Sequence, residues 1–195
     1  MILQKNSLLL LFAFLLLSMP VLGQKNDEYK AGYIVSNSND TLHGYFMIDY
    51  RVNKEIVISF KKNLNEKTME NLDSYNYACL NLEDQFFLST SVQDPNVMQK
   101  ITRMIPRSIN GFYEVFLYEY KVNGVYPRED FFIKGPNYFK QLEKKKSKLK
   151  PQLQLLFADD EFVLSEMERI GVSYDNAMMF FKVYNKRKAQ TSNSK

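Results

Sequence analysis

The fold is decided by residues 113–136, which read YEVFLYEYKVNGVYPREDFFIKGP. Within this stretch, residues 113–121 give the clearest strand signal of the chain, because side chains of one kind recur at every second position. The first face carries Val115 and Leu117, and the second carries Phe116 and Tyr118. Since both faces are apolar or aromatic, the pattern predicts a strand that is covered on both sides.

Residues 113–136 also contain the signals for a hairpin turn and for the end of the β region. Asn123-Gly124 is the strongest short hairpin signal in the sequence, so residues 126–134 are predicted to return antiparallel to the first strand. Pro127 cannot donate a backbone hydrogen bond and confines the start of the return strand to an edge or a bulge. At 135–136 a Gly-Pro pair ends the β pattern, and the apolar spacing becomes helical.

Upstream of this hairpin, short β-rich runs alternate with polar turns, which predicts an antiparallel meander. Residues 31–36 and 41–50 form a first hairpin around the polar residues 37–40, and residues 55–61 follow as a half-buried strand. Residues 74–80 and 85–91 form a second hairpin. We interpret residues 92–100 as a connection and residues 101–105 as a strand that ends at Pro106.

Downstream, the pattern predicts short helices. The first begins near Phe139, and Pro151 interrupts it, followed by a short buried piece at residues 153–157. A second helix has Asp159 as its N-cap and Gly171 as its C-cap. A third starts after Ser173 and carries apolar residues at helical spacing up to Tyr184. The fold class is therefore α+β: an antiparallel β-meander, as a sandwich or open barrel, followed by short C-terminal helices.

The first 23 residues have the three parts of a secretory signal peptide. Lys5 supplies the positive charge, residues 8–17 are an unbroken apolar run too short to span a membrane, and Gly23 is small enough to precede a cleavage site. We therefore expect an exported protein, periplasmic or at the cell surface, with no transmembrane span in the mature chain. Residues 24–186 are predicted to be one α+β domain, β-rich over 24–135 and helical over 136–186, and residues 187–195 a flexible tail.

Composition excludes several functional classes. The chain has one Cys and one His, so an internal disulfide, a Cys-rich zinc site and a multi-His metal site are excluded. Seven glycines form no phosphate-binding loop, and we predict no cofactor and no metal. The net charge of +4 is too weak to indicate nucleic acid as a partner.

Four short motifs give the chain a resemblance to a known group of proteins. Residues 32–37 read GYIVSN and residues 40–45 read DTLHGY; LYEY follows at 117–120 and YN at 184–185. In these features the chain resembles small exported proteins of Bacteroidota, which open with such a hairpin and close with a helix that ends in YN. The resemblance implies an envelope location and brings no catalytic residues. The chain departs from the pattern at residues 92–107 and in its lysine-rich segment. Physically, we expect Gly32 and Gly44 to face each other in the hairpin, with the ring of Tyr33 or Tyr45 across the gap.

The most distinctive charge feature is a run of six lysines within residues 140–150, opposed only by Glu143. Such a run is usually a solvated helix face, but it also creates a local positive field. Outside a bacterial cell, anionic surfaces are lipid phosphates and acidic glycans. The candidate contacts for such a surface are Lys144, Lys145, Lys146, Lys148 and Lys150.

Other candidate residues are weaker. Cys79 is expected to be a buried small hydrophobe, and a thiol–imidazole pair with His43 would require the two to meet in space. Carboxylate pairs that could hydrolyse a glycan stand at 83–84, 129–130 and 159–161. Asn37, Asn39 and Asp40 resemble a calcium loop only faintly. A sugar-binding platform would use tyrosines on predicted strands: Tyr75, Tyr77, Tyr113, Tyr118 and Tyr120.

These observations favour a non-enzymatic protein of the cell envelope that acts as an interaction or ligand-binding module. The partner would be an envelope protein or an anionic glycan or lipid surface. The alternative is a hydrolase that acts on a glycan or another polymer through paired carboxylates.

Overall fold

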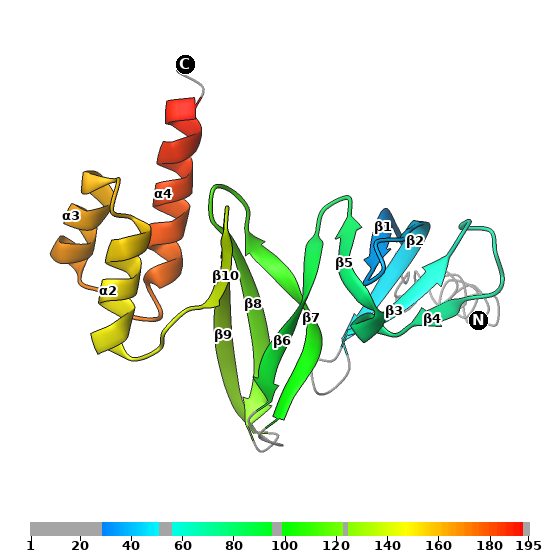
Figure 1. The fold of residues 1–195 in the computed structure, drawn as a ribbon. Helices are drawn as coiled ribbons and strands as arrows, with labels where there is room; N and C mark the ends of the chain where they lie inside the picture. Colours follow the sequence, from blue (N-terminus) through cyan, green and yellow to red (C-terminus); the bar gives the residue numbers. More distant parts are fainter. Residues whose placement is uncertain (1–28, 51–55, 95–98, 123–124, 193–195) are drawn as a thin grey trace, which may run out of the picture.

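A ten-stranded antiparallel sheet followed by three α-helices makes up the described part of the chain (Figure 1). The computed structural model describes residues 29–50, 56–94, 99–122 and 125–192, so the predicted signal peptide lies outside the described residues. The strands are β1 (Lys30–Ser36), β2 (Thr41–Tyr50), β3 (Ile56–Lys61), β4 (Glu70–Leu72), β5 (Tyr77–Leu82), β6 (Phe86–Asp94), β7 (Gln99–Ile109), β8 (Glu114–Val122), β9 (Tyr126–Gly135) and β10 (Tyr138–Gln141). The helices are the short 3-10 turn η1 (Ser74–Asn76), α2 (Lys146–Leu156), α3 (Glu161–Ile170) and α4 (Ala177–Ser192).

The strand order is β10-β9-β8-β7-β6-β5-β1-β2-β3-β4, with each pair antiparallel. The order is a meander from β5 to β10, whereas the first four strands form a second meander that joins it through β1 and β5. The predicted α+β class and antiparallel meander are thus confirmed. Among the helices of the described residues, none has the length and the apolar character needed to cross a membrane.

The sheet changes direction at β7. This strand pairs with β6 from Gln99 to Pro106, but with β8 only through Arg107 and Ile109, where the register shifts. Pro106, which we expected to end the strand, lies inside it at the change of partner, where a missing N–H is best tolerated. The expected connection at residues 92–100 is also wrong: most of it belongs to the β6–β7 pair, which includes Val92 opposite Ile101.

This change of direction creates layers of apolar side chains on both faces of β8 and β9, as the alternation in β8 predicts. Val115 and Ile133 pack against the helices. Phe116 and Phe132 pack instead against β6 and β7. A third cluster, which includes Phe46, is made by side chains of β1 to β7. Burying the two faces of one hairpin in two cores fixes its register, because a slip of one residue would exchange every side chain between them.

The first hairpin confirms the predicted glycine pair. Gly32 faces Gly44 across β1 and β2. A Cβ on Gly44 would lie 2.5 Å from the ring of Phe60, and a Cβ on Gly32 would lie 2.2 Å from the carbonyl oxygen of Asn81. The ring that lies against Gly44 is therefore Phe60 of β3, where we expected Tyr33 or Tyr45, and Gly32 lies against the backbone and side chain of β5.

The C-terminal region differs from its prediction at the points where tertiary contacts outweigh the local pattern. Phe139 lies on strand β10, not on a helix, because its ring stacks on Phe132 with centroids 5.6 Å apart. Pro151 lies inside α2 and does not interrupt it. Leu155, expected in a buried piece, is 78% exposed.

Two helix ends also differ from the prediction, and one agrees with it. The N-cap of α3 is Asp160, not Asp159, and its carboxylate accepts a hydrogen bond from the N–H of Val163. Gly171 is the C-cap as predicted, with a φ of 80° that a residue without Cβ adopts freely. Helix α4 continues to Ser192, so residues 187–192 are helical where the sequence predicts a flexible tail.

Candidate functional site

The predicted lysines gather at the start of α2, but they do not share one environment. Lys144 lies in the connection after β10, Lys145 is the N-cap residue of α2, and the other three lie within the helix. Lys150 forms an ion pair with Glu168 of α3, with 2.7 Å between Nζ and Oε2. Lys145, Lys146 and Lys148 are exposed, and no ion pair of the described residues involves them. These three, here called the lysine cluster, are the part of the predicted contact set that the structure leaves open.

The position of the lysine cluster concentrates positive charge. The N-terminus of an α-helix carries unsatisfied N–H groups and the positive end of the helix dipole. Helix α2 has no acidic residue in its first turn and no side-chain cap. Three ammonium groups thus add to a positive helix end that acidic side chains normally neutralise, and the local field favours anions.

Lys144 is held in place beside the cluster. Its ammonium group forms an ion pair with Asp130 of β9, which is 8% exposed. It also donates a hydrogen bond to the hydroxyl of Tyr120 over 3.3 Å, and it lies 5.5 and 5.7 Å from the ring centroids of Tyr120 and Tyr174. Burial alone would lower the pKa of Lys144, but the bonds to Asp130 and Tyr120 outweigh this effect and raise the pKa. Lys144 therefore stays charged.

A groove of about 450 Å³ opens around Lys144, between the β8–β9 hairpin and the loop that precedes α4. Its wall combines acidic, basic and aromatic side chains. The lining residues are Glu119, Tyr120, Lys121, Pro127, Arg128, Glu129, Lys144, Tyr174 and Asp175. The sequence did not predict the groove as a unit. Three of its residues were separate candidates: Tyr120 for a sugar platform, Glu129 for a carboxylate pair and Lys144 for contact with an anionic surface.

Tyr174 gives the groove a rigid wall. Its hydroxyl accepts a hydrogen bond from the N–H of Phe131 over 2.9 Å and donates one to the carbonyl of Glu129 over 3.4 Å. Its ring stacks on the ring of Phe131 with centroids 5.0 Å apart. This hydroxyl also covers a segment of β9 that β10 does not reach, because β10 pairs only with residues 132–135. Burial raises the pKa of Tyr174, so the hydroxyl keeps its proton and remains a donor.

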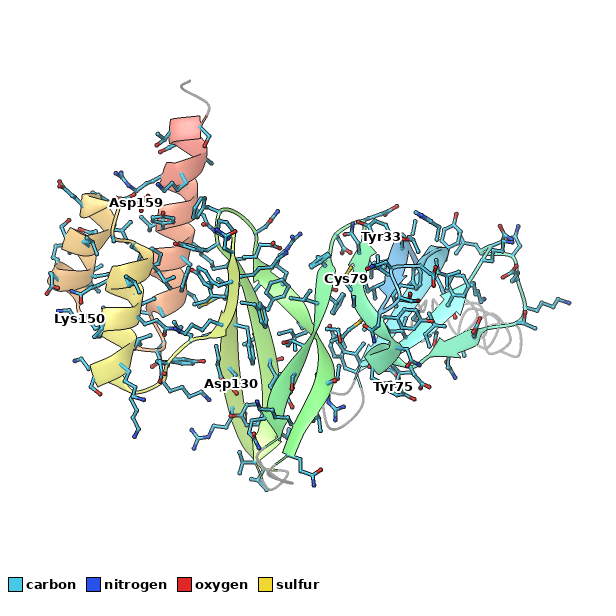
Figure 2. The ribbon with its side chains drawn as sticks, viewed as in Figure 1. Tyr33, Tyr75, Cys79, Asp130, Lys150 and Asp159 are labelled. Atoms are coloured by element: carbon cyan, nitrogen blue, oxygen red, sulfur yellow. The ribbon has the colours of Figure 1, made fainter. Side chains whose placement is uncertain are left out.

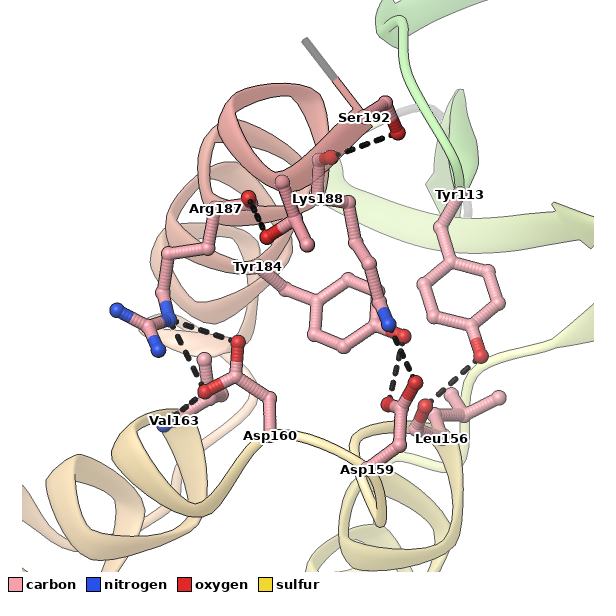
Figure 3. Close-up of polar contacts among 10 residues, drawn as sticks. Tyr113, Leu156, Asp159, Asp160, Val163, Tyr184, Arg187, Lys188 and Ser192 are labelled. Carbon is pink, nitrogen blue, oxygen red and sulfur yellow. Dashed lines mark hydrogen bonds and ion pairs between the residues drawn. The ribbon is translucent and has the colours of Figure 1, made fainter. Parts of the chain in front are cut away.

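At least one carboxylate of each predicted pair is bound to a cation of the chain. Figure 3 shows two of them at the start of α3: Asp159 binds Lys188 and the hydroxyl of Tyr184, and Asp160 binds Arg187 with 2.7 Å between Oδ2 and Nε. Asp84 forms an ion pair with Lys30 over 2.5 Å. Asp130 belongs to the Lys144 pair described above. These carboxylates brace elements of the fold.

The pKa values of Asp159 and Asp160 agree with this structural role. The hydrogen bond from Lys188 lowers the pKa of Asp159. Burial would raise the pKa of Asp160, but the hydrogen bond from Arg187 outweighs it, and the pKa falls. A general acid needs a pKa raised toward neutral pH. Carboxyl groups whose pKa is lowered stay ionised and are unsuited to that task.

Cys79 and His43 do not form a pair. Cys79 on β5 faces Val35 of β1, whereas His43 on β2 faces Tyr33, so strand β1 separates them. Strands β2 and β5 are two inter-strand spacings apart, about 10 Å, which is well beyond the length of a hydrogen bond between the two side chains. Burial raises the pKa of the Cys79 thiol, which disfavours the reactive thiolate. Cys79 is half-buried, less than the full burial that we expected, and Figure 2 shows it on the side of the molecule away from the helices.

The remaining candidates are accounted for by local structure. The turn at residues 37–40 is closed by its own hydrogen bonds, such as that from Ser38 Oγ to Asp40, and no group of metal-ligating side chains occurs in the described parts of the chain. Of the tyrosines considered as a sugar platform, Tyr113 and Tyr118 are buried, and Tyr75 is 58% exposed on η1. Only Tyr120 lines the groove.

We compared the chain with protein-family models, curated proteins and solved structures, and no match was found in any of the three.

Proposed function

We propose that this chain is a protein of the cell envelope that acts by binding, and that the lysine cluster docks it to anionic groups of that envelope. Export is proposed from the signal-peptide pattern of residues 1–23 and from the resemblance to exported proteins of Bacteroidota. The observation that carries the binding role is the placement of three exposed lysines, without ion-pair partners in the described chain, at the positive end of α2.

The chemistry of this cluster suits dense phosphate or carboxylate groups. Ammonium groups on long, flexible side chains bind anions as point charges and make no demand on the angle of approach. Several such contacts act together when the partner carries repeated charges, because the first contact raises the local concentration for the next. A repeating anionic surface is thus favoured over a single small anion.

The hydrolase alternative receives less support. It needs two carboxyl groups with different pKa values facing one cleft. The carboxylates of Asp84, Asp159 and Asp160 have lowered pKa values and bind cations of the same chain. The geometry therefore supports binding better than hydrolysis by Asp84, Asp159 or Asp160; Glu129 alone of the predicted carboxylates lines the groove.

The test uses the mature chain from residue 24 and two anionic probes, vesicles that contain phosphatidylglycerol and a soluble polyuronate. Replacing Lys145, Lys146 and Lys148 by Gln is expected to weaken binding to at least one probe by about tenfold, which corresponds to about 1.4 kcal/mol. The matched control replaces the exposed residues Lys62, Lys67 and Lys100, which removes the same charge from the sheet end of the molecule. Equal losses in the two variants, or no binding of either probe, would refute docking through α2.

A further inference from the structure

The groove and the lysine cluster meet at Lys144. This residue lines the groove beside Tyr120 and Tyr174. It also lines a second hollow of about 280 Å³ with Lys145 and Lys148. The two hollows therefore adjoin at Lys144, close enough for one long ligand to reach both.

The groove has the chemistry of a site for hydroxyl groups. Each hydroxyl both donates and accepts a hydrogen bond, so it is best matched by a wall on which donors and acceptors alternate. Here Arg128 and Lys144 supply donors, and the carboxylates of Glu129 and Asp175 supply acceptors. The volume of about 450 Å³ falls within the range of small-ligand sites.

The walls of the groove are held in place before a ligand arrives. Tyr174 is fixed by its bonds to the backbone of β9, and the ring of Tyr120 stacks on Tyr118 with centroids 5.2 Å apart. Lys144 is anchored by Asp130. A pre-organised site loses less conformational entropy on binding, so weak individual contacts suffice.

The charges of the two hollows differ, and this difference identifies the partner. The hollow at the lysine cluster has an excess of positive charge and attracts acidic groups, whereas the three carboxylates and three cations of the groove wall balance each other. A uniformly anionic bilayer pressed against this face would meet both. A polysaccharide in which acidic and neutral sugars alternate can place each kind of sugar in the hollow that suits it.

We propose that the anionic partner is an acidic polysaccharide, with a neutral, hydroxyl-bearing sugar in the groove and a neighbouring carboxylate-bearing sugar at the lysine cluster. This inference rests on the proposed function, since it names the partner of the same surface. The groove makes the contact specific, and the cluster provides most of its salt-dependent attraction.

The experiment is isothermal titration calorimetry of the mature chain with a hyaluronan octasaccharide, in which neutral and acidic sugars alternate. The informative variant replaces Glu129 and Asp175 by Ala. It makes the protein more positive by two charges, so simple charge attraction predicts tighter binding. The groove predicts the opposite, a loss of about fivefold or more, because two acceptors for hydroxyl groups are gone. The matched control replaces Asp49 and Glu70, two exposed acids on the first strands.

The outcomes separate this inference from the proposed function. Weaker binding of the Glu129→Ala, Asp175→Ala variant, with the control unchanged and thermal unfolding as in the wild type, supports the polysaccharide. Equal or tighter binding of that variant overturns the polysaccharide inference. Binding to anionic vesicles without binding to hyaluronan also overturns it, but leaves the proposed docking to anionic groups standing. Failure of both probes refutes docking as well.

Discussion

Asn185 offers the sharpest test of how the helices are attached to the sheet. It lies on α4 and is 8% exposed. Its side-chain oxygen accepts a hydrogen bond from the N–H of Tyr113 over 3.0 Å, and its amide donates to the carbonyl of Tyr113 over 2.8 Å. It thereby pairs with the backbone just before β8 as a neighbouring strand would. Gly111, with a φ of 150°, leaves the space that the amide needs, because a Cβ there would lie 2.5 Å from Asn185 Nδ2.

Replacing Asn185 by Ala removes both partners of the Tyr113 backbone groups at once. A buried donor or acceptor without a partner costs about 1–3 kcal/mol. Two such groups predict a loss of about 3 kcal/mol in the free energy of unfolding, or about 6–12 °C in the melting temperature for a chain of this size. Asn185→Asp keeps the volume but cannot donate to the Tyr113 carbonyl. It is expected to lose a similar amount at neutral pH, which separates the hydrogen bond from the cavity.

Urea unfolding followed by circular dichroism measures these values, with Lys186→Ala as the control. Lys186 is the exposed neighbour on the same helix, and its replacement is expected to change stability by less than about 0.5 kcal/mol. A loss below about 1 kcal/mol for Asn185→Ala would show that the backbone of Tyr113 finds other partners, and the reasoning would fail.

Three further outcomes follow from the same contacts. Tyr174→Phe leaves the N–H of Phe131 without its hydrogen-bond partner, so the free energy of unfolding should fall by about 1–2 kcal/mol and the melting temperature with it. An unchanged melting temperature would show that water replaces the hydroxyl. Lys144→Met leaves the buried carboxylate of Asp130 without its ion-pair partner, so the urea midpoint should fall by the equivalent of about 2 kcal/mol at pH 7; an unchanged midpoint would contradict this. Alkylation of Cys79 by iodoacetamide should be slow at pH 7 and should accelerate only above the ordinary thiol pKa, because burial raises the pKa; rapid labelling at pH 7 would contradict this.

The strands were predictable wherever a pattern of period two was long enough to separate two faces. The strand at residues 113–121 and its partner are the best example, because the two faces that the alternation defines do pack in two different cores. β10 was missed because it has only four residues and follows a Gly-Pro pair. Its existence depends on Phe139 reaching Phe132, and no local pattern encodes that contact.

The candidate site was predictable only in part, for the same reason. The sequence identifies the lysines as a run but cannot show that Lys150 is bound to Glu168 or Lys144 to Asp130, since each partner lies on another element. The groove joins residues 119–129 to residues 174–175, and the link between them is the hydroxyl of Tyr174 on the edge of β9. Such a contact exists only after the helices have packed on the sheet.

One feature of the lysine cluster argues for a role beyond the fold. Helix starts favour acidic residues and polar N-caps, and each suitable residue there stabilises a helix by about 0.3–1 kcal/mol. Helix α3 follows this rule with Asp160 and Glu161, whereas α2 starts with Lys145 and Lys146 and has no acid in its first turn. The same chain thus contains a conventional helix start and one that opposes the helix dipole. Places where residue choice works against local stability are often functional sites. The lysines at the start of α2 repel the positive end of the helix dipole, and an anion bound there relieves this repulsion. Anion binding therefore stabilises the helix, and the relief of repulsion adds to the affinity for an anionic partner.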